Sequence, residues 1–169
     1  MAQREFLGKE VRLKQKGVFN VEEFYRLFFR WFELHSYTVS EIEYRDIQTG
    51  SGKMLKIKWH CENELDDYIK YVIRPSFLIT GLEKVEGEKD GVKTMLHKAD
   101  IEIKINYYLE KDFNDKWSKS NAVGRFLRAV YDKYFAGNRA DQLKNALIED
   151  VRSVMEEMKA FLNMHRLSP

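Results

Sequence analysis

The chain has 169 residues, of which 44% are hydrophobic and 33% charged, a balance typical of a folded globular protein and unlike that of a disordered or collagen-like chain. Its 29 basic and 27 acidic side chains give a formal net charge of +2, so a polyanionic partner can be argued only from a local excess of charge. The single cysteine, Cys61, excludes an internal disulfide and a cysteine-based zinc site.

The sequence shows no sign of a domain boundary or an export signal. It has only two prolines, Pro75 and Pro169, and no Ser/Gly/Pro-rich linker or internal repeat. No stretch approaches the roughly 20 apolar residues of a membrane span, and the early charges of Arg4 and Lys9 leave no room for the apolar core of a signal peptide. We therefore expect one domain over residues 1–169 in the cytoplasm, where the lone thiol stays reduced.

The first predicted element is a short strand. Residues 5–13 alternate between apolar and polar after Gly8, which indicates a strand that Lys14, Lys16 and Gly17 would end.

An aromatic helix is predicted next, from Val21 to about Ser36. Asn20 and Glu23 have the spacing of an N-terminal cap. The apolar arc of this helix is too wide for one neighbour to cover. Either a sheet and a second helix cover it, or it forms an oligomer or partner surface with Phe29 and Phe32 as candidate interface residues.

Strand patterning follows as far as about residue 113. Residues 38–47 and 53–62 predict a hairpin around the turn at 49–52, with Ile57, Trp59 and Cys61 on the buried side. Residues 64–75 fit both a helix and a strand, and their β-branched and aromatic content favours the strand. Pro75 would then lie at an edge or a bulge, or end one segment before another begins over residues 77–86.

The clearest strand precedes the C-terminal helices. After a turn at Asp90 and Gly91, residues 99–110 alternate strictly, which predicts a sheet with one buried and one solvent-exposed face. Its expected buried positions are Ala99, Ile101, Ile103, Ile105, Tyr107 and Leu109.

Two helices are predicted after this strand. Ser118 or Ser120 would cap the first, and Gly137 would end it. Its apolar stripe comprises Ala122, Val123, Phe126, Leu127, Val130, Tyr131, Tyr134 and Phe135. The final helix would run from Asp141 to Met164. The predicted fold class is α+β, a two-layer arrangement of an antiparallel β-meander with helices packed on one face and a long C-terminal helix.

This order of a strand, an aromatic helix, an antiparallel meander and a long terminal helix is similar to that of the helix-grip lipid-transfer superfamily. The resemblance spans the chain through its layout alone, and it implies a curved sheet that wraps the last helix and is able to enclose an apolar ligand. No ligand residue is carried over from it.

Candidate catalytic patterns have simpler structural explanations. Residues 49–53 look like the end of a phosphate-binding loop, but Ile47 stands where a glycine is needed and Met54 where a hydroxyl is needed. On a strand His60 and Cys61 face opposite sides. His60 and Glu62, with Asp100 or Glu102 across from them, suggest either an acid/base or metal site or ordinary cross-strand pairs. The sequence thus predicts no catalytic residues, no metal and no cofactor.

Residues 116–139 carry the largest local charge excess, with six basic residues against Asp132 alone. Arg125, Arg128 and Asp132 lie opposite the apolar stripe and would therefore face solvent. The candidate anion-binding residues are Lys119, Arg125, Arg128 and Arg139.

Three hypotheses for function remain open. The first is a non-catalytic binding or assembly module that uses apolar helix faces, with a second copy or another protein as its partner. The second is a carrier or sensor of a hydrophobic small molecule between the sheet and the last helix, lined by Trp59, Ile103, Tyr107, Met155 and Met158. The third is a protein that associates with nucleic acid through residues 116–139.

Overall fold

The computed structural model describes residues 2–114, 122–135 and 137–164. Along these ranges the chain forms, in order, β1 (Gln3–Phe6), β2 (Val11–Phe19), α1 (Val21–Leu34), β3 (Thr38–Thr49), β4 (Gly52–Glu64), β5 (Ile69–Lys89), β6 (Val92–Lys111), α2 (Ala122–Phe135) and α3 (Asn138–Met164).

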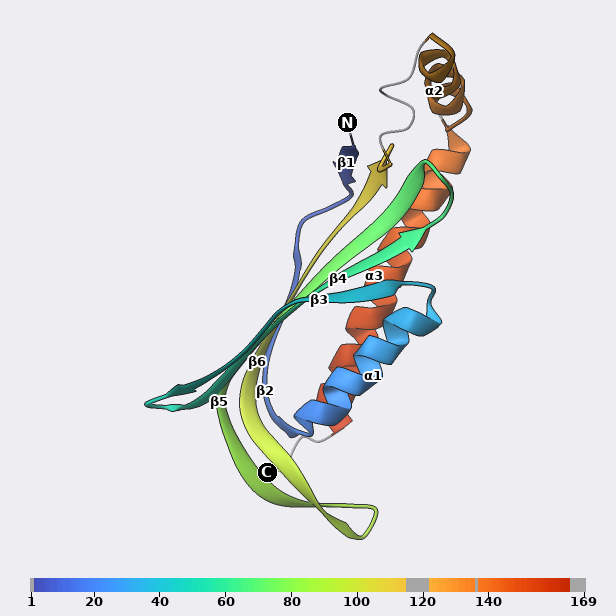
Figure 1. Cartoon of the computed structure of the whole chain (residues 1–169). Helices are drawn as coiled ribbons and strands as arrows, with labels where there is room; N and C mark the ends of the chain where they lie inside the picture. The colour runs from blue at the N-terminus through green and yellow to red at the C-terminus, as the bar shows by residue number, and fades with distance from the viewer. Residues whose placement is uncertain (1, 115–121, 136, 165–169) are drawn as a thin grey trace.

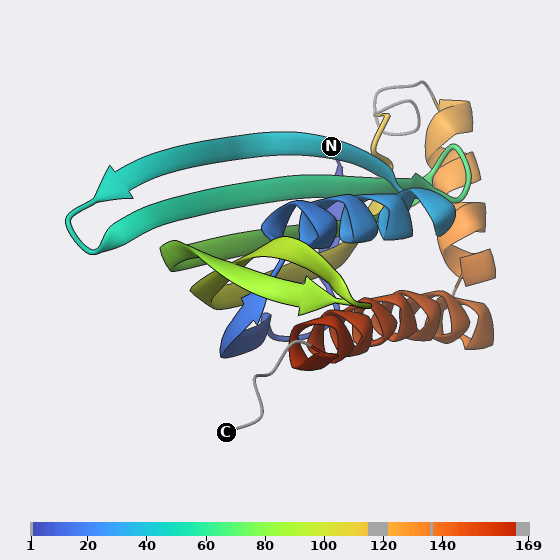
Figure 2. The ribbon, with the colours of Figure 1, turned by 90° about the horizontal axis from the view of Figure 1, so that it is seen from below.

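The described strands form one antiparallel sheet in the order β1-β6-β5-β4-β3, and β2 also pairs with β6. Helices α1 and α3 lie side by side against one face of this curved sheet, as Figures 1 and 2 show from two directions. Among the described residues no helix lies against the opposite face. The predicted α+β class, with an antiparallel sheet, helices on one face and a long last helix, is therefore confirmed.

The strand predicted over residues 5–13 is wrong in its bounds. There are two strands here, and β2 continues through Lys14, Lys16 and Gly17 to Phe19, because all of its residues from Val11 onward pair with β6. The lysines project from the open face of the sheet, so they do not interrupt the strand. Gly8 lies in the break between the strands, where a side chain would meet the Tyr107 hydroxyl.

Helix α1 begins as predicted. The Asn20 side-chain oxygen accepts a hydrogen bond from the Glu23 backbone N–H at 3.0 Å, which satisfies one of the free donors of the first turn. Phe24 and Phe28 are buried and meet Phe161 of α3 at ring-centroid distances of 5.7 and 6.0 Å. A sheet below and a helix beside it therefore cover most of the wide apolar arc.

The predicted 38–62 hairpin is confirmed, and the ambiguous 64–75 segment is a strand from Ile69 onward. Pro75 is neither at an edge nor at the end of a segment. It lies in the central strand β5 opposite Ile105, and the β4 register is unchanged on both sides of it. The bulge occurs later, between Thr80 and Glu83, where Gly81 adopts a positive φ of 62°.

Strand β6 follows the predicted alternation over most of its length, and its expected apolar positions are buried. Its last residues depart from it, since Tyr108 and Glu110 on the open face are also buried. The side chains of β1 lie against them, with the Phe6 ring tilted against the Tyr108 ring at a centroid distance of 5.0 Å and Arg4 Nε 3.3 Å from Glu110 Oε1. One end of the open face is thus closed by the N-terminus.

Helix α3 covers the sheet with one continuous apolar side. Its buried residues are Leu147, Val151, Val154, Met155, Met158, Phe161 and Leu162. Gly137, with a φ of 100°, separates α3 from α2, so the predicted stop is confirmed and α3 begins immediately after it.

Helix α2 is oriented opposite to the prediction. The side chains expected to pack inward are largely exposed, among them Val123, Phe126, Leu127, Val130 and Tyr134. The polar side of the helix faces the protein through Arg128 and Asp132. The predicted caps, Ser118 and Ser120, lie outside the described residues.

Candidate anion-binding face of the sheet

The open face of the sheet is lined by the polar residues of five strands. Residues that pair across neighbouring strands project to the same side. Two adjacent cross-strand rows therefore run over the middle of this face. The first row contains Arg12, Lys104, Ser76, Lys58 and Glu43, and the second contains Lys14, Glu102, Leu78, Lys56 and Arg45.

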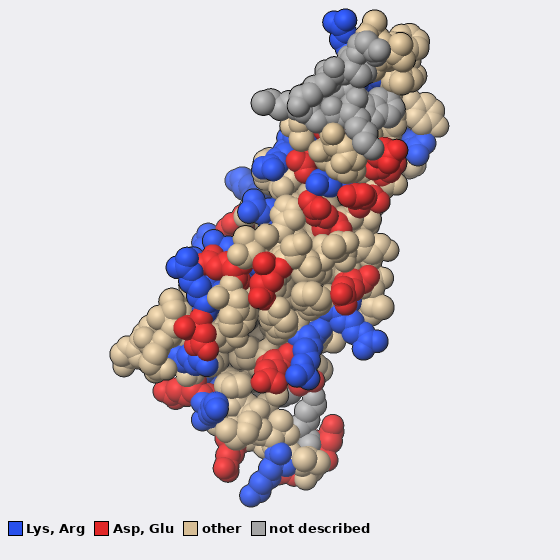
Figure 3. All heavy atoms as spheres, viewed as in Figure 1, with Lys and Arg blue, Asp and Glu red and all other residues tan. Residues whose placement is uncertain are grey.

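These two rows hold six cations and two carboxylates, a formal excess of four positive charges in a molecule whose total is +2. We call the six cations the cationic belt. They are Arg12, Lys14, Arg45, Lys56, Lys58 and Lys104. Figure 3 shows the open face edge-on along the left flank, where Lys and Arg gather with Asp and Glu set among them.

The first half of the belt surrounds Glu102 on β6. Lys104 Nζ lies 2.8 Å from its Oε1, Lys14 Nζ 3.1 Å from its Oε2, and Arg12 Nε 3.8 Å from its Oε1. Hydrogen bonds from Lys104 and Lys14 hold the pKa of this carboxyl below its ordinary value. Glu102 is therefore ionised at neutral pH, and three cations share its one charge.

The second half repeats this arrangement around Glu43 on β3. Arg45 Nε lies 2.9 Å from its Oε1, Lys58 Nζ 3.0 Å from its Oε2, and Lys56 Nζ 3.5 Å from its Oε1. The hydrogen bond from Lys58 is the main reason that the pKa of Glu43 is lowered.

The carboxylates lie low on the surface and the cations stand above them. The side chains of Glu43 and Glu102 are 16% and 18% exposed, whereas those of the belt cations are 38% to 66% exposed. An approaching molecule therefore meets ammonium and guanidinium groups first. Surface ion pairs of this kind contribute little to stability, which leaves the cations free to exchange partners.

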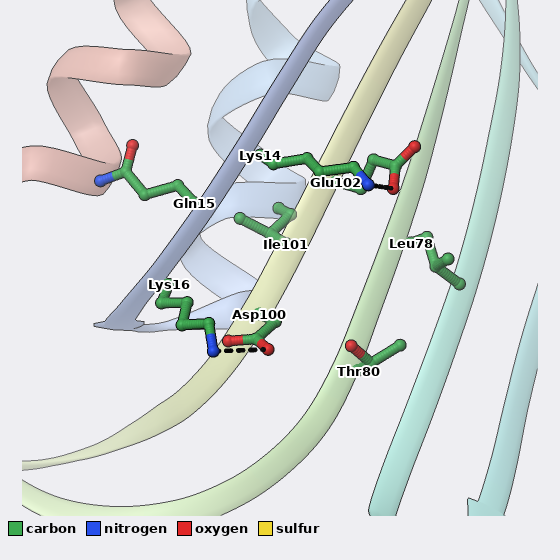
Figure 4. Close-up of a pocket in the computed structure, with 8 residues that line it drawn as sticks. All are labelled: Lys14, Gln15, Lys16, Leu78, Thr80, Asp100, Ile101 and Glu102. Carbon is green, nitrogen blue, oxygen red and sulfur yellow. Dashed lines mark ion pairs between the residues drawn. The ribbon is translucent and has the colours of Figure 1, made fainter.

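Strand β5 separates the two halves of the belt and contributes only the neutral Ser76 and Leu78 to these rows. Because neighbouring strands lie about 4.8 Å apart, the two halves are centred about 14 Å from each other. A surface hollow of about 370 Å³ crosses this side of the sheet beside Lys14, Leu78 and Glu102. In Figure 4, Lys14 and Lys16 of β2 reach toward Glu102 and Asp100 of β6.

The rows beside the belt are closer to neutral. Lys16 Nζ lies 3.7 Å from Asp100 Oδ2, and Glu10 pairs with Arg12 at 3.3 Å. A second hollow of about 600 Å³ borders Lys16, Asp100 and Lys98.

His60 and Glu62 belong to an ion-pair network on the open face. His60 Nε2 and Lys70 Nζ lie 2.8 and 2.7 Å from Glu62 Oε1, and Lys70 also reaches Glu110 at 3.4 Å. Burial alone would raise the pKa of Glu62, but the hydrogen bonds from Lys70 and His60 outweigh it and lower the pKa. Asp100 and Glu102 do not stand across from His60, because they pair with Thr80 and Leu78 further along β5.

The predicted anion-binding residues do not share one surface. Arg125 is exposed, but Arg128 turns inward, with its Nη1 4.0 Å from the buried Asp112 and its Nε 3.9 Å from Asp132. Arg139 donates to the Tyr134 hydroxyl at 3.2 Å. Lys119 lies outside the described residues. The prediction that Arg128 faces solvent is wrong, since this side chain is 25% exposed and points toward Asp112, whereas Asp132 is half-exposed.

The predicted ligand-lining residues all lie between the sheet and the helices, within one buried cluster. Trp59 packs edge-on against Phe29 and Phe77 at centroid distances of 5.6 and 5.0 Å, so aromatic rings occupy its surroundings. Tyr107 and Met155 also border a surface groove of about 270 Å³ beside α3. The buried members are Trp59, Ile103, Tyr107, Met155 and Met158.

The interface predicted at Phe29 and Phe32 is not open to a partner at Phe32. That side chain is completely buried against Tyr37 and Trp59, and Phe29 is half-buried against the same core. The exposed apolar residues of α1 are instead Leu27 and Leu34.

Comparison with known proteins adds no family to this description, since neither a protein-family model nor a curated protein matches the chain. In the part of the chain that the structure describes, no helix is both long and apolar enough to cross a membrane. Within the same residues no three His, Cys, Asp or Glu side chains gather closely enough to bind a metal ion. The functional interpretation therefore depends on the charge and geometry of the open face.

Sequence reasoning missed the belt because it treated each strand alone. The signal was present as basic residues two apart, at Arg12, Lys14 and Lys16 and again at Lys56 and Lys58. The strand register is needed to show that these runs lie side by side. The exposed fractions of the side chains are needed to show that Glu43 and Glu102 lie beneath the cations.

Proposed function

We propose that this protein is a non-catalytic binding module that holds the phosphate backbone of a nucleic acid duplex on the cationic belt. The supporting observation is that six exposed cations on four strands surround two low-lying carboxylates, with Glu10 as a further partner of Arg12. Phosphate contacts by Lys and Arg dominate affinity for nucleic acid and need no base recognition. The proposed nucleic-acid site is therefore the open face of the sheet and not residues 116–139.

The division of the belt into two halves favours a duplex over a single strand. The halves are centred about 14 Å apart, which is comparable to the roughly 12 Å width of the major groove of B-form DNA. Each half can therefore contact one of the two backbones that border a groove. Aromatic side chains that would stack on unpaired bases are not part of the two belt rows.

The test is fluorescence anisotropy with a labelled DNA duplex of about 20 base pairs, titrated between about 50 and 200 mM salt. The belt variant carries Lys14→Gln, Lys58→Gln and Lys104→Gln. We expect it to bind at least about tenfold more weakly and to lower the slope of log affinity against log salt by about three, since each lost phosphate contact lowers it by about one.

The matched control carries Lys84→Gln, Lys93→Gln and Lys159→Gln, which changes the net charge equally at sites away from the belt. It should bind nearly as well as the unmodified protein. Equal losses in both variants would mean that only net charge matters, and the belt would not be a site. Equal affinity for a single strand of the same sequence would refute the groove-spanning arrangement. If the unmodified protein binds phosphatidylserine vesicles and not the duplex, and the belt variant loses that vesicle binding, the belt is a membrane site instead.

A further inference from the structure

Helix α2 is held to the end of the sheet by polar contacts. Tyr68 donates to Asp132 Oδ1 at 3.1 Å, Tyr131 donates to Asp66, and the two tyrosine rings lie 4.4 Å apart. Arg128 adds ion pairs to Asp132 and to Asp112 of the loop after β6. These contacts fix the rotation of α2 about its own axis, so the direction of its apolar side is determined by the fold.

That apolar side points to solvent. We call it the α2 face, and its members with their exposed fractions are Val123 (63%), Phe126 (67%), Leu127 (45%), Val130 (48%) and Tyr134 (66%). An amphipathic helix of a monomeric protein normally buries such a stripe. A contiguous exposed patch of this kind marks a surface that another phase or molecule covers.

The position of α2 makes this face accessible. Figure 1 places the helix at one end of the elongated molecule, beyond the end of the sheet, and Figure 2 shows it standing across the end of α3.

Two cations border the α2 face. Lys133 is exposed beside it, and the Arg139 guanidinium lies over the Tyr134 ring at 5.2 Å. The one acidic residue of α2, Asp132, lies on the opposite side and is held by Tyr68 and Arg128. An apolar face with a cationic border complements the interface of an anionic bilayer, where acyl chains lie beneath phosphate and carboxylate groups.

The size of the face argues against a second copy as its occupant. Its five side chains are 45% to 67% exposed, and since a large side chain offers roughly 150 to 250 Å² when fully exposed, together they present on the order of 500 Å² of accessible surface. A standard protein–protein interface needs about 800 Å² from each partner. A bilayer sets no such minimum, because each apolar side chain that enters it contributes independently.

We propose that the α2 face docks this protein on the surface of an anionic lipid bilayer, with Phe126 and Val130 in the acyl region and Lys133 and Arg139 at the headgroups. This surface is separate from the cationic belt. The helix lies in the plane of the interface and does not cross it.

Vesicle co-flotation tests the proposal, with phosphatidylcholine vesicles compared with vesicles that contain about 30% phosphatidylserine. We expect the protein to float with the anionic vesicles and much less with the neutral ones. Phe126→Ser with Val130→Ser should reduce the bound fraction about tenfold or more, because two apolar side chains lose their transfer out of water.

The matched control is Leu34→Ser with Val92→Ser, which removes two apolar side chains of similar exposure elsewhere on the surface. It should float like the unmodified protein. Circular dichroism melts of both variants should match, because all four positions are exposed. Failure of the unmodified protein to bind anionic vesicles would overturn the proposal, as would equal binding by the α2 variant. A doubled mass in light scattering that only the α2 variant abolishes, without vesicle binding, would assign the face to a second copy instead. None of these outcomes depends on duplex binding by the belt.

Discussion

Lys14 Nζ on β2 lies 3.1 Å from Glu102 Oε2 on β6, and the lysine side chain is 66% exposed while the carboxylate is 18% exposed. The cation thus stands between its counter-ion and solvent. The same geometry around Glu43 makes the open face more positive to an approaching molecule than its charge count suggests.

Removal of the shared carboxylate should strengthen binding. In Glu102→Gln the three surrounding cations lose their common counter-ion, so their charge is available to phosphate. We expect the affinity for a DNA duplex to rise several-fold and the salt dependence to steepen by about one in the slope of log affinity against log salt. Glu157→Gln on α3 makes the same charge change away from the belt and should bind as the unmodified protein does. An unchanged or weaker affinity for Glu102→Gln would contradict a phosphate-binding belt.

The sequence predicted the fold well where one periodicity dominated. Strict alternation over 99–110 located β6, and the Asn20 cap located the start of α1. It failed where a tertiary contact outweighed the local pattern. Pro75 pairs with Ile105 of β6 but has no recorded pair on the β4 side, and the register with β4 is the same before and after it, so the missing N–H does not end the strand. The sequence pattern predicts that Lys14 and Lys16 end the first strand, but in the structure both residues pair with β6 inside β2.

The candidate surfaces were harder to predict because they depend on relations between elements. Arg128 and Phe126 lie on opposite sides of α2 in any helical projection, but periodicity does not say which side meets the sheet. In the structure the Arg128 side meets the sheet, where Arg128 lies near the buried Asp112 and Tyr68 donates to Asp132. Because the apolar stripe lies on the opposite side of α2, it faces solvent.

Arg128 and Arg125 should therefore behave differently on mutation. Arg128→Gln removes an ion-pair partner of the buried Asp112, and we expect it to lower the free energy of unfolding by about 1 to 3 kcal/mol. Arg125→Gln removes the same charge from an exposed position of the same helix and should stay within about 0.5 kcal/mol of the unmodified protein. Urea denaturation measures both. Equal stabilities would show that Arg128 does not anchor α2.

Mutation of Met158 distinguishes a filled core from a ligand-binding cavity between the sheet and α3. Its side chain is completely buried in the main core cluster, so Met158→Ala should lower the free energy of unfolding by about 2 to 5 kcal/mol. Met95→Ala, at a half-exposed position of β6, is the control and should change it by about 0.5 kcal/mol or less. A small loss at Met158 in urea denaturation would indicate empty or ligand-filled space beside this residue.

His97 should make the free energy of unfolding depend on pH just below neutrality. Its Nδ1 is buried without a hydrogen-bond partner among the described residues. Burial, reinforced by the charges of Lys84 and Lys53 and opposed by Glu22, lowers the pKa of His97 from its ordinary value of 6.5. The unfolded chain therefore binds a proton more readily than the folded one, and the stabilisation is present above pH 6.5 and is lost as the pH falls through the lower folded pKa.

We accordingly expect the midpoint of urea unfolding to fall between about pH 7.5 and pH 5.5. The lowered pKa values of Glu43 and Glu102 act below their ordinary value of 4.5, outside this window. In His97→Gln the titrating group is gone, so the same acidification should leave the midpoint nearly constant. If the variant and the unmodified protein lose stability in parallel, another group is responsible, and His97 is solvated in the folded chain.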